Sequence, residues 1–186
     1  MSYIKELLKD RDNPYEIDLE LKVRKIFENN TDYHFEIQKN DNEFGVDLIV
    51  FKYDIEKNKY KKRKVAFIEV EVSENWVNEY PVYWRTYSFL KRKVFEFDNY
   101  KNVFTDNLKK DYYKTIYIIF NKSFSDCICQ SMSYISSLNS VRISAGDNER
   151  SRWMLRTGLN DQNIKRGIDE VFEFCDEFIQ LRAFLQ

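Results

Sequence analysis

The arrangement of apolar and polar positions along the chain predicts four strands. Residues 33–38 alternate between apolar and polar side chains, whereas residues 47–53 and 64–72 each contain an apolar run, and Glu69 and Glu71 alternate with apolar residues in the second of these runs. A period of two is typical of strands that bury one face. The polar residues 54–63 lie between the second and third segments and predict a hairpin with a long tip. Residues 114–120 are almost continuously apolar, which predicts a central, buried strand.

Apolar residues at helical spacing predict helices on both sides of these strands. The first helix is expected over residues 15–28, after the start signal Asn13-Pro14, and the second over residues 83–97. A last helix is expected from about 160 to 185, and a shorter one over residues 126–138. The chain therefore combines strands and helices throughout its length.

The order of these elements predicts an α/β (α+β) fold with a mixed central sheet flanked by helices. Residues 141–144 are expected to form a short edge strand, followed by a polar connection over residues 145–158. We expect a single domain over residues 1–186. Its core covers about 15–121, and about 122–186 form a C-terminal helical elaboration.

Composition excludes several classes of protein. The 186 residues are 43% hydrophobic and carry a net charge of −1, so the chain is globular and is no polycation. Its three cysteines have no spacing typical of zinc sites. No apolar run approaches the ~18 residues of a membrane span, and no secretory signal opens the chain, so a reducing cytoplasmic setting is expected. P-loop, dinucleotide-binding and serine-hydrolase motifs are also missing from the sequence.

Acidic residues interrupt two of the predicted strands. Asp47 opens the second strand, and Glu69 and Glu71 lie two residues apart in the third. Alternation places Glu69 and Glu71 on one face of the sheet, and the hairpin brings Asp47 to the same end. Because buried carboxylates are costly without compensation, such a cluster indicates either a divalent metal site or a solvated strand face. Both alternatives stay open on these residues alone.

The strand order, with Gly45-Val46-Asp47 opening one strand and Ile68-Glu69-Val70-Glu71 in the next, resembles the PD-(D/E)XK (restriction-endonuclease-like) nuclease superfamily. This superfamily includes restriction enzymes, resolvases and many phage and viral nucleases. The resemblance covers about residues 15–121 and implies an αβββαβ core with extra C-terminal helices. It also implies hydrolysis of phosphodiester bonds in DNA, duplex or branched, by a protein that depends on Mg²⁺ or Mn²⁺.

The resemblance assigns roles to individual residues. Asp47 and Glu69 match the acidic metal ligands, and the Val70 carbonyl is the third oxygen expected there. Glu71 stands where most members carry lysine, so the chain resembles an ExE variant in which Glu71 is a second ligand or a base. Glu20 matches the acidic residue of the first helix, with Glu16 as the alternative. The expected catalytic group is therefore Glu20, Asp47, Glu69 and Glu71.

Basic residues supply candidate contacts with nucleic acid. Six cations occur within residues 57–64, and Lys61, Lys62 and Arg63 are among them. Arg85 and Lys91 lie in the helix expected after the third strand, and Arg152 lies beside Trp153 with other arginines. These groups either contact phosphates or form ordinary solvated surfaces.

Two further alternatives concern partners. The residues Ile164, Ile168, Val171, Cys175 and Phe178 form an apolar seam in the last helix, which is either core packing or a homodimer face. Because lysine is missing from the motif, a catalytically inactive protein of the same fold that binds nucleic acid or a protein partner is the alternative function. A protein-binding inhibitor or scaffold is a weaker option. His34, the single histidine, is read as a strand residue without a catalytic role.

Overall fold

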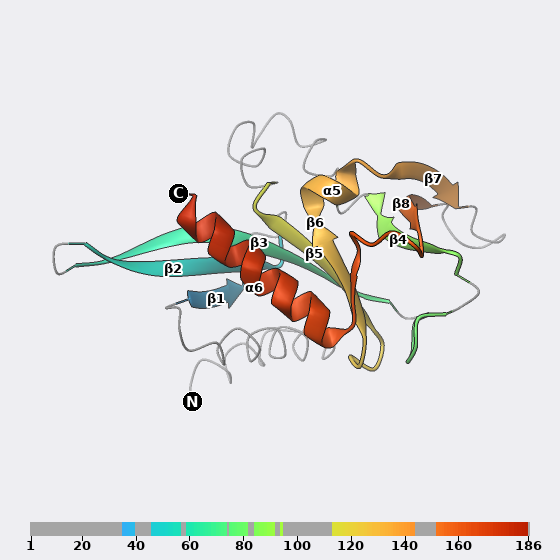
Figure 1. Ribbon diagram of the computed structural model, residues 1–186, viewed down its shortest axis with the longest axis horizontal. Coiled ribbons are helices and arrows are strands. Elements are labelled where there is room, and N and C mark those ends of the chain that lie inside the picture. The colour runs from blue at the N-terminus through green and yellow to red at the C-terminus, as the bar shows by residue number, and fades with distance from the viewer. Residues whose placement is uncertain are drawn as a thin grey trace.

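The computed structural model describes residues 35–39, 46–56, 59–73, 75–81, 84–91, 94, 113–143 and 152–185. The larger sheet contains, in spatial order, β1 (Phe35–Lys39), β2 (Leu48–Glu56), β3 (Lys59–Ser73), β5 (Thr115–Asn121), β6 (Cys127–Ser131) and β9 (Lys165–Arg166). The smaller sheet contains β4 (Thr86–Leu90), β8 (Arg152–Gly158) and β7 (Asn139–Ile143). The helices whose bounds lie within the described ranges are α5 (Met132–Ser136) and α6 (Ile168–Phe184) (Figure 1). Lys91 and Val94 are also helical. The predicted first helix and Glu20 lie outside these ranges.

The larger sheet is mixed, and the α+β class predicted from the sequence is confirmed. Strands β1, β2 and β3 pair antiparallel, β5 runs parallel to β3, and β6 and β9 continue the sheet antiparallel. Every residue of β5 is buried, as its continuous apolar run predicts. Successive side chains of a strand point to opposite faces of the sheet, and apolar residues occupy both faces. One core cluster therefore lies on each side of the sheet.

The hairpin of β2 and β3 is longer than its sequence predicts. Residues 54–63 were expected to be a loop, but β2 continues to Glu56 and β3 begins at Lys59, paired directly with Glu56. The two strands project beyond the rest of the sheet as an arm (Figure 1). Lysine-rich segments are poor strand formers by propensity, but Lys61, Lys62 and Lys64 keep exposed side chains while their backbone pairs with β2. Cross-strand pairing therefore overrides the local signal.

A β-bulge divides this arm from the body of the sheet. Val50 pairs with Ala66, whereas the next residue, Phe51, pairs with Lys64, which leaves Val65 as the extra residue of β3. A bulge of one residue reverses the alternation of the strand that carries it. Even-numbered residues of β3 face α6 on the body side of the bulge and face away from α6 on the arm side.

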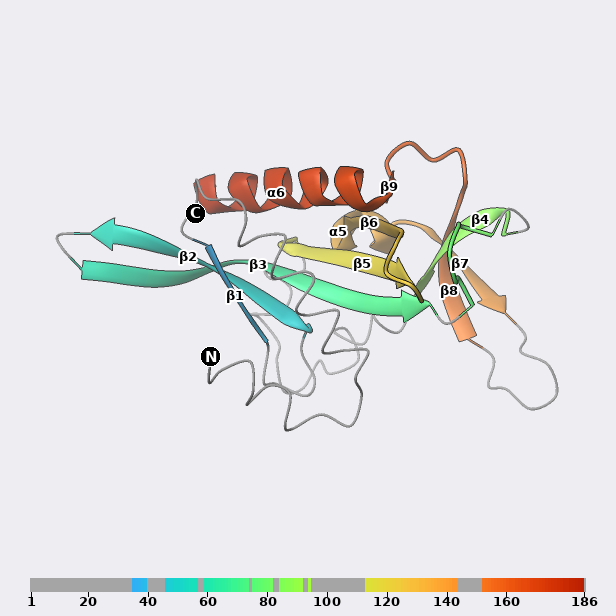
Figure 2. The same ribbon diagram turned by 90° about the horizontal axis from the view of Figure 1, so that it is seen from below.

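Helix α6 covers one face of the larger sheet (Figures 1 and 2). Its buried residues are Val171, Cys175, Phe178, Ile179 and Ala183. They pack in the same cluster as Leu48, Ile68 and Ile118 of the strands, which confirms core packing for this part of the predicted seam. The helix begins later than expected because Lys165 and Arg166 pair with β6 and Gly167, at φ 84°, turns the chain before the helix.

Two strands of the smaller sheet are formed by residues that were predicted to form other elements. Residues 86–90 were predicted to be helical but form β4, in which Tyr87 and Phe89 are buried while Thr86 and Ser88 are half-buried. Residues 152–158 were predicted to be a polar connection but form β8, which pairs with β4 and β7. The predicted helix over 126–138 is divided into strand β6 and the short helix α5. The C-terminal part is therefore mixed rather than helical.

The cysteines provide a pH-dependent prediction. Cys127 and Cys129 are buried free thiols, and burial raises the pKa of each well above the ordinary value of 9.0. Because the thiols ionise only in the unfolded chain, their stabilising effect is complete below pH 9 and is lost as the pH rises. Between pH 8 and pH 10 we expect each thiol to reduce the free energy of unfolding by about 1.4 kcal/mol. Urea unfolding at both pH values measures the loss.

The matched variant is Cys127→Ala, which removes one of the two thiols. Its loss between pH 8 and pH 10 should be about 1.4 kcal/mol smaller than that of the wild type. An equal loss in both proteins would show that Cys127 does not stay neutral in the native state.

Candidate active site

The hairpin places Asp47 against the motif of β3. Asp47 directly precedes β2, whose first residue, Leu48, pairs with Ile68. The Oδ2 atom of Asp47 accepts a hydrogen bond of 2.8 Å from the backbone N–H of Val70. A charged acceptor on a backbone donor is a strong, short contact, so the Asp47 carboxylate is held in place between the positions of Glu69 and Glu71.

The three carboxylates lie on the face of the larger sheet that α6 does not cover. Leu48, Ile68 and Val70 belong to the core cluster beneath α6, so the alternating residues Asp47, Glu69 and Glu71 face the other way. Glu69 is only 4% exposed. Three like charges on neighbouring positions raise the free energy of one another's ionised forms, and a cation relieves this repulsion.

Tyr117 is a site residue that the sequence reasoning did not find. In the parallel pairing of β3 and β5, Tyr117 lies beside Glu69, and its hydroxyl donates a hydrogen bond to Oε2 of Glu71. Burial, followed by the nearby Glu71 carboxylate, raises the pKa of Tyr117 well above 10.0. The hydroxyl therefore stays protonated and orients Glu71. The available signal was that Tyr117 is the one polar-tipped side chain within residues 116–120.

The donor set consists of oxygen atoms, which suits a hard cation such as Mg²⁺ or Mn²⁺. Within the described ranges, no three or more His, Cys, Asp or Glu side chains come together as a complete metal site. Glu20, the further expected acidic residue, lies outside those ranges. Mg²⁺ is commonly held by one or two carboxylates, with water and substrate phosphate completing its shell, so Asp47 and Glu69 are a sufficient protein contribution.

The bulge determines which basic residues of the arm lie on the same face of the sheet as Asp47, Glu69 and Glu71, called here the carboxylate face. Lys62 lies with its Nζ 4.1 Å from the ring centroid of Phe51 and 3.3 Å from Oε2 of Glu36. Lys64, two residues along β3, is exposed on the same face. Arg63 lies on the α6 face, where its Nη2 donates to the carbonyl of Ala183 at 3.1 Å. By alternation Lys61 also belongs to that face.

The remaining basic residues lie near the smaller sheet, although Arg85 and Lys91 were expected on a helix and Arg152 in a polar connection. Lys91 is helical, as expected. Arg85 is exposed and directly precedes β4. Lys91 directly follows β4, and its Nζ donates to Oγ of Ser140 at 3.0 Å. Arg152 is the first residue of β8 and pairs with Ile143. The structure thus gathers Lys91 and Arg152 at one sheet and leaves them apart from Lys62 and Lys64 on the arm.

Comparisons with known proteins were made for the whole chain. No protein-family model and no curated protein sequence matches it. Among solved structures, the chain is similar to D212, a nuclease from a fusselovirus, with 14% sequence identity, a TM-score of 0.44 and 89% of each chain covered. At that TM-score the functional assignment depends on the chain's own residues. Within the described residues no helix has the length and apolar character needed to cross a membrane.

Proposed function

We propose that the protein is a metal-dependent DNA endonuclease that hydrolyses phosphodiester bonds, with Mg²⁺ or Mn²⁺ held by Asp47, Glu69 and the Val70 carbonyl. The observation that carries the proposal is the hydrogen bond from Val70 N–H to Asp47, on the sheet face that also bears Glu69 and Glu71. In an extended strand the N–H and C=O of one residue point to the same side. The Val70 carbonyl therefore points toward the Asp47 side of β3.

In this mechanism the protein residues position and polarise the reacting groups. A bound divalent ion would supply positive charge where negative charge develops on the phosphoryl oxygens. Asp47 is held by the Val70 N–H, so its remaining oxygen keeps a defined direction. Glu71 is oriented through Oε2 by the protonated Tyr117 hydroxyl, and its other oxygen is the proposed acceptor for a proton of the attacking water. Glu71 thereby replaces the lysine found in most members of the superfamily.

The direct test incubates the purified protein with supercoiled, linear and branched DNA in Mn²⁺ or Mg²⁺. We expect nicking or cleavage of at least one substrate, which a chelator abolishes. If no DNA is cut in either metal, the endonuclease proposal is wrong.

One observation favours a second candidate function, a nuclease-fold protein that binds nucleic acid or a protein partner without catalysis. Glu71 stands in place of lysine and is already hydrogen-bonded to Tyr117. Calorimetry with Mn²⁺ separates the two candidates. Metal binding that Glu69→Gln removes supports the enzyme, whereas salt-sensitive DNA binding that is indifferent to metal supports the binding protein.

The arm gives a prediction about salt dependence. Each phosphate neutralised by a lysine contributes about 0.9 to the slope of log K against log salt for duplex DNA. We expect Lys64→Ala, on the carboxylate face, to lower that slope by about 0.9, as measured by fluorescence anisotropy over a series of salt concentrations. Lys61→Ala, on the opposite face of the same strand, is the matched control and should leave the slope unchanged. A slope for Lys64→Ala equal to that of the wild type would exclude Lys64 from the DNA interface.

A homodimer through the C-terminal helix remains a proposal. The buried face of α6 is used for core packing, but Leu181, Phe184 and Leu185 near its end are exposed. Two copies joined there would provide the two sites that cutting both strands of a duplex requires. Sedimentation of the purified protein measures the oligomeric state directly.

A further inference from the structure

Trp153 is the large aromatic residue of β8 that stands out from the core. It is 51% exposed, whereas Trp76 is fully buried. Leu155, two residues along the strand and on the same face, is buried against Phe89 of β4. The side chain of Trp153 therefore extends the same face beyond the edge of the core and into solvent. A half-exposed indole presents an aromatic ring to a partner in solution.

Two cations lie close to the exposed indole. The Nζ atom of Lys91 lies 5.1 Å from the centroid of the Trp153 ring and is held by its hydrogen bond to Ser140 of β7. Arg142, two residues farther along β7, is exposed and is the direct cross-strand neighbour of Trp153. Side chains of directly paired residues point to the same face of a sheet. Trp153, Lys91 and Arg142, called here the tryptophan platform, thus combine an aromatic surface with two positive charges.

The tryptophan platform is linked to the carboxylate site by a continuous row of side chains. The ring of Phe89 packs edge-on against Tyr117, with 5.6 Å between centroids, and Tyr117 donates to Glu71. Phe89 is paired with Leu155, and Trp153 lies two residues, or roughly 7 Å, farther along β8. The smaller sheet lies past the C-terminal end of β3, at the opposite end of the molecule from the arm (Figures 1 and 2).

An aromatic ring beside two cations matches the chemistry of a nucleotide. The ring offers a π-surface on which a base can stack, and the cations can pair with neighbouring phosphates. A protein partner would favour an apolar surround, but the neighbouring apolar residue Val141 points to the opposite face of β7 because it alternates with Arg142. Base pairs inside a duplex are stacked on one another, so only an unpaired base can use this ring.

We propose that the tryptophan platform binds an unpaired base, so that the substrate is DNA with a single-stranded segment rather than uninterrupted duplex. This inference rests on the proposed function for its link to cleavage, and it names the substrate class of the same site. The unpaired strand lies over the smaller sheet and approaches the carboxylates from the side opposite the arm. Lys91 and Arg142 hold its phosphates while Trp153 stacks on one base.

The test measures binding in a chelator, so that no cleavage occurs. Anisotropy titrations use a labelled oligothymidylate and a blunt duplex of equal length. We expect Trp153→Ala to weaken binding of the single strand about 5- to 150-fold, the effect of losing one stacked base. The slope against log salt and the binding of the blunt duplex should not change. Trp153→Phe should retain most of the affinity, and Arg142→Ala should lower the single-strand slope by about 0.7.

Two controls exclude an effect on folding. Val141→Ala removes an exposed apolar side chain from the opposite face of β7 and should bind like the wild type, and the circular dichroism of all variants should agree. The oligothymidylate should also quench the tryptophan fluorescence of the wild type but not that of Trp153→Phe. Wild-type affinity in Trp153→Ala, or an equal loss for single strand and duplex, would overturn the proposal.

The results also separate this inference from the nuclease proposal. Loss of single-strand binding in Trp153→Ala with no cleavage of any DNA retains the tryptophan platform and rejects the enzyme. Metal-dependent cleavage combined with unchanged binding by Trp153→Ala retains the enzyme and rejects the tryptophan platform.

Discussion

Replacing Asp47 by asparagine should reduce metal-dependent DNA cleavage by at least 10²- to 10³-fold, the range seen when one group that stabilises developing charge is removed. Asparagine keeps an oxygen that can accept the hydrogen bond from Val70 N–H, so the hairpin end should remain intact. What the substitution removes is the negative charge that would hold the cation. Single-turnover cleavage of the best DNA substrate measures the effect, with urea unfolding as the check on stability.

Two matched variants sharpen this prediction. Glu69→Gln should produce a loss of the same order, because it neutralises the neighbouring carboxylate on the same face. Glu177→Gln neutralises an exposed carboxylate on α6, on the other side of the sheet, and should cut like the wild type. If Asp47→Asn cuts DNA at the wild-type rate, this carboxylate has no part in the chemistry.

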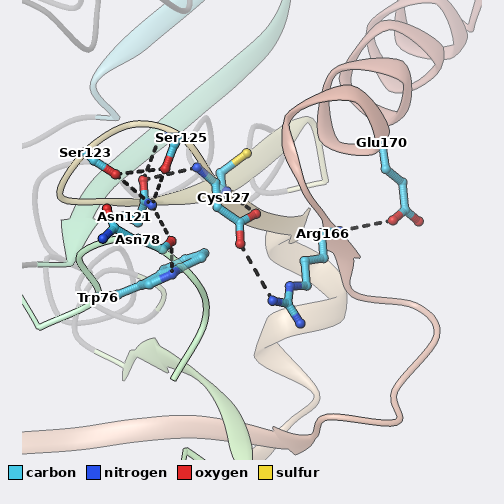
Figure 3. Close-up of polar contacts among 9 residues, drawn as sticks. Trp76, Asn78, Asn121, Ser123, Ser125, Cys127, Arg166 and Glu170 are labelled. Carbon is cyan, nitrogen blue, oxygen red and sulfur yellow. Dashed lines mark hydrogen bonds and ion pairs between the residues drawn. The ribbon is translucent and has the colours of Figure 1, made fainter. Parts of the chain in front are cut away.

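The second large effect is expected at Asn121, which lies at the end of β5 and is fully buried. Its Nδ2 donates to the carbonyl of Asn78 at 2.6 Å and to Oγ of Ser125 at 2.9 Å, and its Oδ1 accepts from the backbone N–H groups of Ser125 and Asp126 (Figure 3). The same Asn78 carbonyl accepts from Nε1 of Trp76. One amide therefore joins the turn after β5 to the segment that follows β3.

We expect Asn121→Ala to lower the free energy of unfolding by about 3 kcal/mol or more. Each buried polar group left without its partner costs about 1–3 kcal/mol, and several lose theirs together. Urea unfolding at neutral pH measures the change. Ser123→Ala removes an exposed hydroxyl that donates to the Val77 carbonyl and accepts from Nδ2 of Asn121. Because this hydroxyl is open to solvent, water can take over its bonds, and the substitution should cost less than about 1 kcal/mol. Equal stability of the two variants would mean that the amide is not the main connection.

Local sequence patterns were sufficient to predict those elements whose buried residues are recognisable within a single segment of the chain. The alternation of β1, the apolar runs of β5 and of the body of β2 and β3, and the buried stripe of α6 were all predictable on this basis. The shared face of Glu69 and Glu71 follows from alternation inside a single strand. The predicted metal, its ligands and the homodimer stay predictions, because the structure contains neither ions nor a second chain.

The errors arise where pairing partners are distant in sequence. The spacing of Tyr87, Leu90 and Val94 imitates a helix, but antiparallel pairing with β8 makes residues 86–90 a strand. Among residues 153–158 of β8, only Leu155 is buried, so that strand has little apolar signal of its own. Tyr117 beside Glu71, and Lys91 beside Trp153, both depend on registers between strands that no local pattern encodes.

The unpaired residue Val65 determines which cations of the arm share the carboxylate face. If Val65 paired regularly with Phe51, each arm residue of β3 would move by one position, and Lys62 and Lys64 would turn toward the side of α6. Deleting Val65 would not have this effect, because Lys64 would then directly precede Ala66 and stay opposite Phe51. One apolar residue that carries no charge therefore sets the placement of the cations around it.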